Sequence, residues 1–323
     1  MTRLPIARYI GAVVLLHFFA CVHSVDINSA DPPDPIRGEL HQFEFAESTI
    51  FPGTKRDVWV YIPAECDPAV PSCVAAVCDG RAYVQPKQAN FAPVVFDDLI
   101  ASGEMPVTIG VFVNPGIVPA PNAAAQPRFN RSYEYDGLGE DYARFLQDEL
   151  LPEIERRFDV VLSDDPNDRL VGGASSGGIC AFNVAWSRPD WFGRVWCTVG
   201  TFVGLRGGDE LHTLVRKTES KPLRIFLHDG DQDLNIYAGD WWMANRQMQR
   251  ALAWRGYEHD FVWDQSKHGR DGEKKFLKRG LRFLWKDYPK QVTTHTEDAA
   301  PRRATFLIEG EDWELVSDGH GFN

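Results

Sequence analysis

The sequence predicts an α/β protein with a mostly parallel central sheet covered by helices on both faces. Short, continuously apolar segments alternate with helix-length segments along most of the 323 residues. Strands buried on both faces have this apolar character, and parallel neighbours need crossover helices between them. A glycine-rich turn at 172–178 also separates an apolar strand from a helix-compatible run. With 44% hydrophobic residues, the chain can form one large core.

The predicted elements follow one another in a regular order. Short runs of β-branched, aromatic and apolar residues predict strands at 41–48, 57–62, 73–78, 107–113, 170–171, 195–199, 223–227 and 259–263. Helical periodicity and stop signals predict helices at 90–101, 137–158, 179–186, 211–217, 240–255 and 276–287. The helix at 137–158 is the most amphipathic, and 117–135 is predicted to be irregular.

The N-terminal segment predicts export. Arg3 and Arg8 precede an apolar stretch at 9–20 that is too short for a stable membrane span. We expect a signal peptide at 1–24 and a secreted or periplasmic protein; a lipid anchor on Cys21 is the alternative. An extended leader (25–38), a main domain (39–290), and a linker with a C-terminal tail (291–323) are expected to follow.

Charge and cysteine content limit the partners. The chain has 34 Lys and Arg against 46 Asp and Glu, a net charge of −12, and its sequence has no basic cluster of the kind that nucleic acid requires. Five cysteines lie beyond the expected signal peptide, and their spacing fits no zinc motif, so no metal is expected. Export permits disulfides. Two pairings are considered. Cys66 and Cys73 could close a proline-rich loop, and Cys180 and Cys197 could either pair or remain as two buried thiols.

The glycine-rich turn carries the main functional signal. Residues Gly173 to Gly177 fit the pattern Gly-x-Ser-x-Gly, the nucleophile elbow of the α/β-hydrolase fold. A strand enters this turn and a helix leaves it, which lifts the serine hydroxyl above the sheet. Ser175 is therefore the predicted nucleophile.

A serine nucleophile needs a base, and the base needs an orienting acid. In this fold the acid and then the histidine follow the serine, each on a loop after a strand. His268 is the predicted base. Asp233 is the predicted acid, with Asp231 as its rival and Asp229 expected to stabilise the turn.

Backbone N–H groups are expected to stabilise the oxyanion. Ser176, which follows the nucleophile, supplies one of them. The loop after strand 73–78 supplies the other, and the Arg81 N–H is the predicted donor. Trp241 follows the acid loop and is predicted to line an acyl or sugar pocket, with core packing as the alternative.

Four segments together resemble one family. They are 77–83, 131–135, 173–178 and the Asp-Gly-x-x-Asp at 229–233. This set resembles the enterochelin esterase-like group of α/β-hydrolases, which is related to feruloyl and acetylxylan esterases, over about residues 40–290. The resemblance implies ester hydrolysis without metal or cofactor. It also implies that Arg131 and Glu134 lie near the site, where they orient substrate or brace the loop.

The sequence departs from that family just before the predicted base. Relatives often carry Gly-Gly before the base, whereas Ser266 and Lys267 precede His268 here. The tail at 309–322 resembles the opening of a gluconolactonase-type propeller, and we interpret it as a remnant without lactonase activity.

The function expected from the sequence is that of a serine esterase acting through an acyl-enzyme. A siderophore ester, a polysaccharide-linked feruloyl or acetyl ester and a small lactone all remain open as substrates. The alternatives are an acyltransferase and a non-catalytic protein that binds a glycan or a siderophore. The sequence does not predict an oligomeric state.

Overall fold

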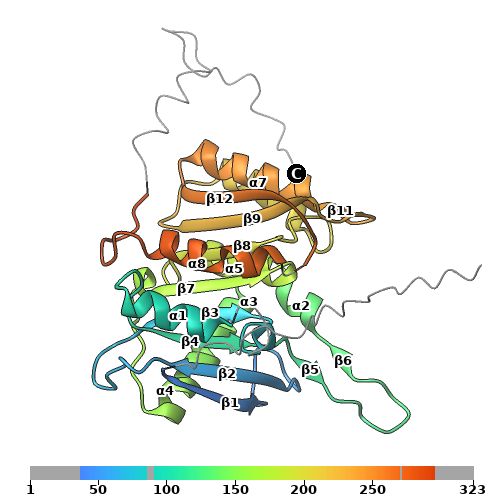
Figure 1. Ribbon diagram of the computed structural model, residues 1–323. Helices are drawn as coiled ribbons and strands as arrows, with labels where there is room; N and C mark the ends of the chain where they lie inside the picture. The colour runs from blue at the N-terminus through green and yellow to red at the C-terminus, as the bar shows by residue number, and fades with distance from the viewer. Residues whose placement is uncertain (1–36, 86–90, 270, 295–323) are drawn as a thin grey trace, which may run out of the picture. The chain divides into compact units, whose positions relative to one another are not determined.

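The computed structural model describes residues 37–85, 91–269 and 271–294, without the side chains of 271–274. Its centre is an eight-stranded sheet in the order β1-β2-β4-β3-β7-β8-β9-β12 (Figure 1). The strands are β1 (Glu39–Phe45), β2 (Arg56–Ile62), β3 (Cys73–Cys78), β4 (Thr108–Val113), β7 (Arg169–Ala174), β8 (Arg194–Thr198), β9 (Arg224–Gln232) and β12 (Glu258–Lys267). β1, β2 and β4 pair antiparallel, and all pairs from β4 to β12 are parallel. The predicted α/β-hydrolase architecture is confirmed.

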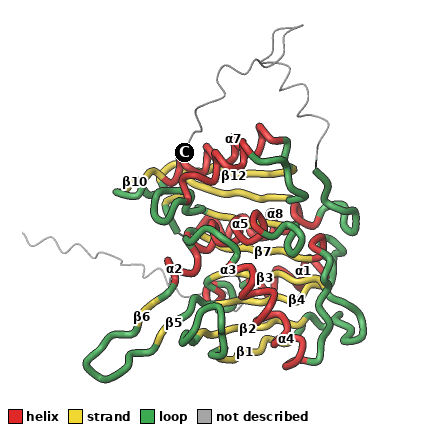
Figure 2. The backbone as a smooth tube through the Cα atoms, turned by 180° about the vertical axis from the view of Figure 1, so that it is seen from behind, coloured by secondary structure: helices red, strands yellow, loops and turns green. Residues whose placement is uncertain are grey.

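Helices cover both faces of the sheet, as Figures 1 and 2 show from opposite sides. One face packs against α1 (Ala92–Ala101) and α8 (Asp271–Trp285), which form one apolar core with the strands. The other face packs against the remaining long helices, α5 (Ser176–Ser187) and α7 (Trp241–Arg255), and forms the second core. The central strands β3, β4 and β7 are buried along their whole length, which explains their continuous apolar sequence.

The segment predicted as one amphipathic helix at 137–158 is divided into three parts. It consists of α3 (Asp141–Arg144), a π-helical turn (Phe145–Leu150) and α4 (Leu151–Phe158). Pro152 at the start of α4 has no N–H for the regular i→i−4 bond, which favours a wider turn just before it. The predicted apolar stripe is nevertheless buried from Tyr142 to Ile154.

The segment at 117–135 is more ordered than predicted. It forms a small hairpin of β5 (Ile117–Val118) and β6 (Arg128–Phe129), followed by the short helix α2 (Arg131–Tyr135). A second hairpin, β10 (Asn235–Ile236) with β11 (Gly239–Asp240), follows β9. α6 (Leu211–Lys217) packs beside α7. Both hairpins follow the carboxyl ends of strands, the edge where α/β proteins place their sites.

The described cysteines are free thiols. Cys66 packs against the α5–α7 core and Cys73 against the α1–α8 core, so their side chains lie on opposite faces of the sheet. The Cys66–Cys73 disulfide considered above is therefore not formed. Cys180 contacts Cys78 rather than pairing with Cys197, in agreement with the alternative of buried thiols.

The predicted signal peptide, most of the leader and most of the C-terminal tail lie outside the described residues. Among the helices that the structure describes, none is both long and apolar enough to cross a bilayer.

Candidate active site

The turn between β7 and α5 holds Ser175 in an unusual backbone conformation. Its φ is 58° and its ψ is −123°, which a non-glycine residue adopts only under strain. The surrounding glycines make this turn possible. A Cβ on Gly173 would lie 2.5 Å from the carbonyl oxygen of Gly177, so a side chain at this position cannot be accommodated without movement. The turn therefore has the geometry of a nucleophile elbow.

Two loops bring a histidine and a carboxylate to this serine. The Nε2 atom of His268 lies 3.0 Å from the Oγ of Ser175. The Nδ1 atom of His268 lies 2.5 Å from the Oδ1 of Asp233. His268 follows β12 and Asp233 follows β9, and these neighbouring parallel strands end at the same edge of the sheet. The three side chains have the connectivity of a Ser-His-Asp triad.

Among the carboxylates at the carboxyl end of β9 and just after it, the structure brings Asp233 to the histidine. Its side chain is fully buried. Burial alone would raise the pKa of Asp233, but the hydrogen bonds from His268, Asp229 and the Leu234 N–H outweigh it and hold this pKa below its ordinary value. Asp231, the rival considered above, is exposed to solvent. Asp229 accepts a hydrogen bond of 2.7 Å from the Gly230 N–H, as expected for a residue that stabilises the turn.

Trp241 lies behind the triad instead of lining an open pocket. It is 3% exposed, and its ring packs edge-to-face against the ring of His268 with a centroid distance of 5.8 Å. Its Nε1 donates a hydrogen bond to the Oγ1 of Thr201, which lies 3.4 Å from the Oγ of Ser175. The core-packing alternative therefore describes Trp241 better than the substrate-binding prediction, and Thr201 is a neighbour of the nucleophile that the sequence did not reveal.

The two predicted oxyanion donors differ in their present partners. Ser176 is the first residue of α5, where backbone N–H groups have no partner within the helix. The Arg81 N–H instead donates to the Oδ1 of Asn114 at 3.1 Å. An oxyanion would have to share or replace this acceptor, so the predicted role of Arg81 depends on Asn114.

Arg131 and Glu134 both brace the loops around the site. Arg131 forms a bidentate ion pair with Asp79, at 2.9 Å from Nε and 2.7 Å from Nη2. Its side chain remains 38% exposed, so it is accessible from solvent. Glu134 is completely buried and forms a bidentate pair with Arg56, at 2.7 and 3.1 Å. This burial removes Glu134 from contact with substrate and favours the bracing role.

Comparison with known proteins identifies the family. The sequence model of the family described as "Putative esterase" matches residues 48–275. The chain belongs to this esterase family. The esterase is 27% identical over 252 residues to the Iron(III) enterobactin esterase of Dickeya dadantii (strain 3937), a match that covers 73% of this chain and 52% of the relative. It spans about half the length of that curated relative.

Solved structures share the fold of the esterase. The enterobactin esterase of Shigella flexneri, crystallised in the presence of 2,3-di-hydroxy-N-benzoyl-serine, has a TM-score of 0.62 at 21% identity, covering 79% of this chain and 61% of its own. A feruloyl esterase module from Clostridium thermocellum has a TM-score of 0.58 at 12% identity, with coverages of 81% and 93%. At these identities the likeness shows a common fold.

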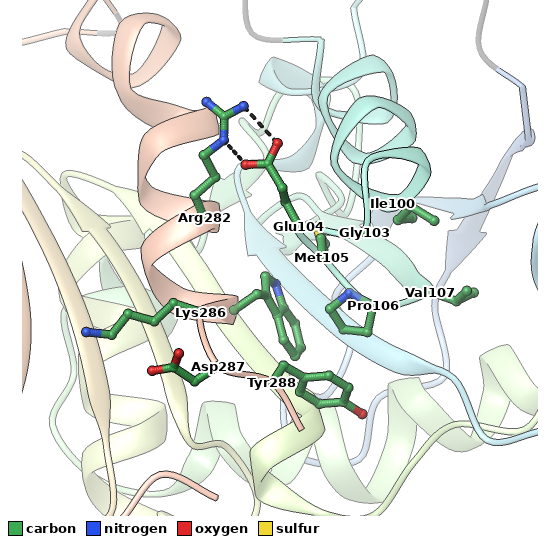
Figure 3. Close-up of a pocket in the computed structure, with 11 residues that line it drawn as sticks. Ile100, Gly103, Glu104, Met105, Pro106, Val107, Arg282, Lys286, Asp287 and Tyr288 are labelled. Atoms are coloured by element: carbon green, nitrogen blue, oxygen red, sulfur yellow. Dashed lines mark hydrogen bonds and ion pairs between the residues drawn. The ribbon is translucent and has the colours of Figure 1, made fainter. Parts of the chain in front are cut away.

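A separate pocket of about 520 Å³ (Figure 3) lies at the opposite end of the parallel strands from Ser175, Asp233 and His268. The loop between α1 and β4 and the end of α8 line it, at the amino end of β4. Glu104 and Arg282 form an ion pair across it. Triad residues are absent from its lining, so this pocket is distinct from the site around Ser175.

Proposed function

We propose that the esterase hydrolyses carboxylic esters through Ser175, His268 and Asp233. The observation that carries this proposal is the continuous hydrogen-bond connection from the Oγ of Ser175 through His268 to the carboxylate of Asp233. A serine hydroxyl is a poor nucleophile at neutral pH unless an adjacent base accepts its proton. Here the base lies within hydrogen-bond distance, and a buried carboxylate orients it.

The proposed reaction has two halves. In the first, the Oγ of Ser175 attacks the ester carbonyl carbon while the Nε2 of His268 accepts the hydroxyl proton. His268 then gives that proton to the leaving alcohol, and an acyl-enzyme remains on Ser175. In the second half, His268 takes a proton from water as the water oxygen attacks the acyl carbonyl carbon. It then returns that proton to the Oγ of Ser175 when the acyl–oxygen bond breaks, which releases the acid and regenerates the enzyme. Asp233 stays ionised and stabilises the imidazolium formed in each half.

The negative charge that develops on the carbonyl oxygen needs hydrogen-bond donors. The Ser176 N–H, at the positive end of α5, is the proposed first donor. The Arg81 N–H is the proposed second donor, released when Asn114 turns its Oδ1 away.

Esters of the enterobactin type are the first substrate class to test. The curated relative that matches 73% of this chain carries that activity in its name, and feruloyl esterases share the fold. Feruloyl, acetyl and small lactone substrates are the other members of the panel. The acidic net charge of −12 disfavours long-range attraction of strongly anionic substrates.

Labelling with a fluorophosphonate probe tests the activated serine. We expect labelling of the wild type, none of Ser175→Ala and slow labelling of His268→Ala, with Asp231→Asn as a matched control that labels normally. A folded wild type that does not label would refute the proposal and favour a binding protein. Turnover that depends on an added acyl acceptor, and exceeds hydrolysis, would instead indicate acyl transfer.

We further propose that the esterase is exported by residues 1–24. Two arginines followed by an apolar stretch support this proposal. N-terminal sequencing of the protein recovered outside the cytoplasm tests it, with a start at Val25 expected. A lipid on Cys21, or an intact N-terminus in the cytoplasm, would contradict it.

A further inference from the structure

A second buried carboxyl group lies directly behind the proposed catalytic acid. Asp229, near the end of β9, is completely buried, and its side chain lies within hydrogen-bonding reach of that of Asp233. The proposed mechanism gives Asp229 no role. Yet two adjacent carboxyl groups in a water-excluded environment cannot both carry a negative charge without a large energetic cost. One proton must be held between them.

The hydrogen-bond partners decide which carboxyl group holds this proton. The Oδ1 of Asp233 accepts hydrogen bonds from the Nδ1–H of His268 and from the Leu234 N–H, both at 2.5 Å. Asp229 has two weaker, neutral partners, the Gly230 N–H at its Oδ1 and the Asn245 side-chain amide. The Oδ2 atoms of both groups have no N–H or O–H partner among the described residues. The better-solvated anion is Asp233, so the proton resides on the Oδ2 of Asp229 and points to Asp233.

We infer that Asp229 is a protonated positioning residue whose carboxylic O–H donates a hydrogen bond to the Oδ2 of Asp233. This inference rests on the proposed function, because it assigns a role behind the same triad. The extra donor fixes the orientation of the Asp233 carboxylate toward His268. It also stabilises the negative charge of Asp233 without adding a positive charge that would weaken its interaction with the imidazolium.

The surroundings of Asp229 keep its proton in place. Burial, followed by the hydrogen bond with Asp233 and then by its negative charge, raises the pKa of Asp229 to about 9. The groups that face it are the Cys197 thiol on β8, the Asn245 amide on α7 and Asp233 itself, with His268 beyond. Apart from His268, none of these groups can carry a positive charge. Asp229 thus remains neutral through the range in which a serine esterase works.

Three variants separate this role from simple packing. Asp229→Asn keeps the shape, and its amide N–H can replace the carboxylic O–H as the donor. Asp229→Leu removes the donor, and we expect kcat to fall by about tenfold to a hundredfold, the effect of one hydrogen bond to a charged group. Asp229→Asn should restore most of this loss. Asp231→Asn, on the exposed side of the same strand, is the matched control and should behave as the wild type.

The pH profile gives a readout that a packing role would not change. Above about pH 9 the wild type loses the Asp229 proton, and the paired negative charges disrupt the Asp233 orientation, so kcat should fall. Asp229→Asn has no proton to lose and should lack this fall. If Asp229→Asn shows the same alkaline fall as the wild type, the inference is overturned.

A stability measurement tests the same proton without any catalysis. The ordinary pKa of an aspartate in an unfolded chain is about 3.9, so the folded wild type holds a proton that the unfolded chain releases between that value and about 9. The unfolding free energy of the wild type should therefore decrease relative to that of Asp229→Asn as pH rises from about 5 to about 9. Parallel curves would overturn the inference. A wild type that fails to label at Ser175 would refute only the proposed hydrolysis, since this comparison does not depend on activity.

Discussion

Replacement of Glu134 by glutamine should destabilise the esterase strongly. Glu134 holds the guanidinium of Arg56 with two hydrogen bonds, and it also accepts one from the Gly116 N–H at 3.1 Å. Both side chains of the pair are 0% exposed. The Glu134→Gln variant leaves the positive charge of Arg56 buried without a counter-charge. The new amide also places an N–H donor against the N–H donors of the Arg56 guanidinium.

The expected magnitude follows from this burial. Removal of one partner of a buried ion pair costs about 3–5 kcal/mol, because the remaining charge is desolvated and unpaired. For a domain of this size, each kcal/mol lowers Tm by about 2–4 °C, so we expect Tm to fall by roughly 10 °C. The stacking of Arg56 over the Phe145 ring, at 4.2 Å, does not replace the lost charge.

Guanidinium chloride unfolding, followed by circular dichroism and tryptophan fluorescence, measures this loss. Glu44→Gln is the matched control, because Glu44 pairs with Lys55 at 3.0 Å and both side chains are about half exposed. It should change the unfolding free energy by less than about 1 kcal/mol. If Glu134→Gln unfolds like the wild type but has a raised KM, Glu134 contacts substrate and the bracing role is wrong.

Three further outcomes are expected. The pKa of Asp233 is held below its ordinary value of about 3.9, so the ionised side chain should stabilise the fold fully above about pH 4 and less as pH falls further. Acid unfolding of the wild type and of Asp233→Asn tests this, and equal acid sensitivity of the two proteins would contradict it. Gly173→Ala should express poorly or lose activity, because its Cβ would lie 2.5 Å from a backbone oxygen, whereas Gly177→Ala should be milder, because its Cβ would lie 3.0 Å from the Cys78 Cβ. Thermal unfolding and probe labelling rank the two variants, and the reverse order would refute the steric argument. Among the described cysteines, Cys66 alone is partly exposed, so it should be alkylated first when the native protein is treated with a thiol reagent and analysed by mass spectrometry. Faster modification of a buried thiol would contradict this and show that the core opens.

The sequence was sufficient for the parts of the fold that depend on local patterns. Continuous apolar runs located the buried strands, and the nucleophile turn was found because glycine is required at specific positions around Ser175. The predicted order of acid and base after Ser175 also led to the two residues that the structure places beside it.

The remaining features depend on contacts that are distant in sequence. The sequence left substrate orientation and bracing both open for Glu134, because its partner Arg56 lies 78 positions earlier and no local pattern reveals a buried pair of this kind. The hydrogen bond between the Arg81 N–H and Asn114 likewise joins two separate loops. The sequence left the Cys66–Cys73 pairing open, because spacing alone does not show that the two side chains point to opposite faces of the sheet.

The position of β12 has a consequence for how the esterase loses activity. Among the strands that the structure describes, β12 is the last of the sheet and pairs with β9 alone, yet His268 follows it directly. Edge elements with few neighbours open locally at lower free energy than the centre of a fold. Partial detachment of β12 would separate the base from Ser175 while the strained turn on the central strand β7 stayed intact. In mild denaturant, inactivation should therefore precede the loss of secondary structure, so that activity reports on the edge and circular dichroism on the core.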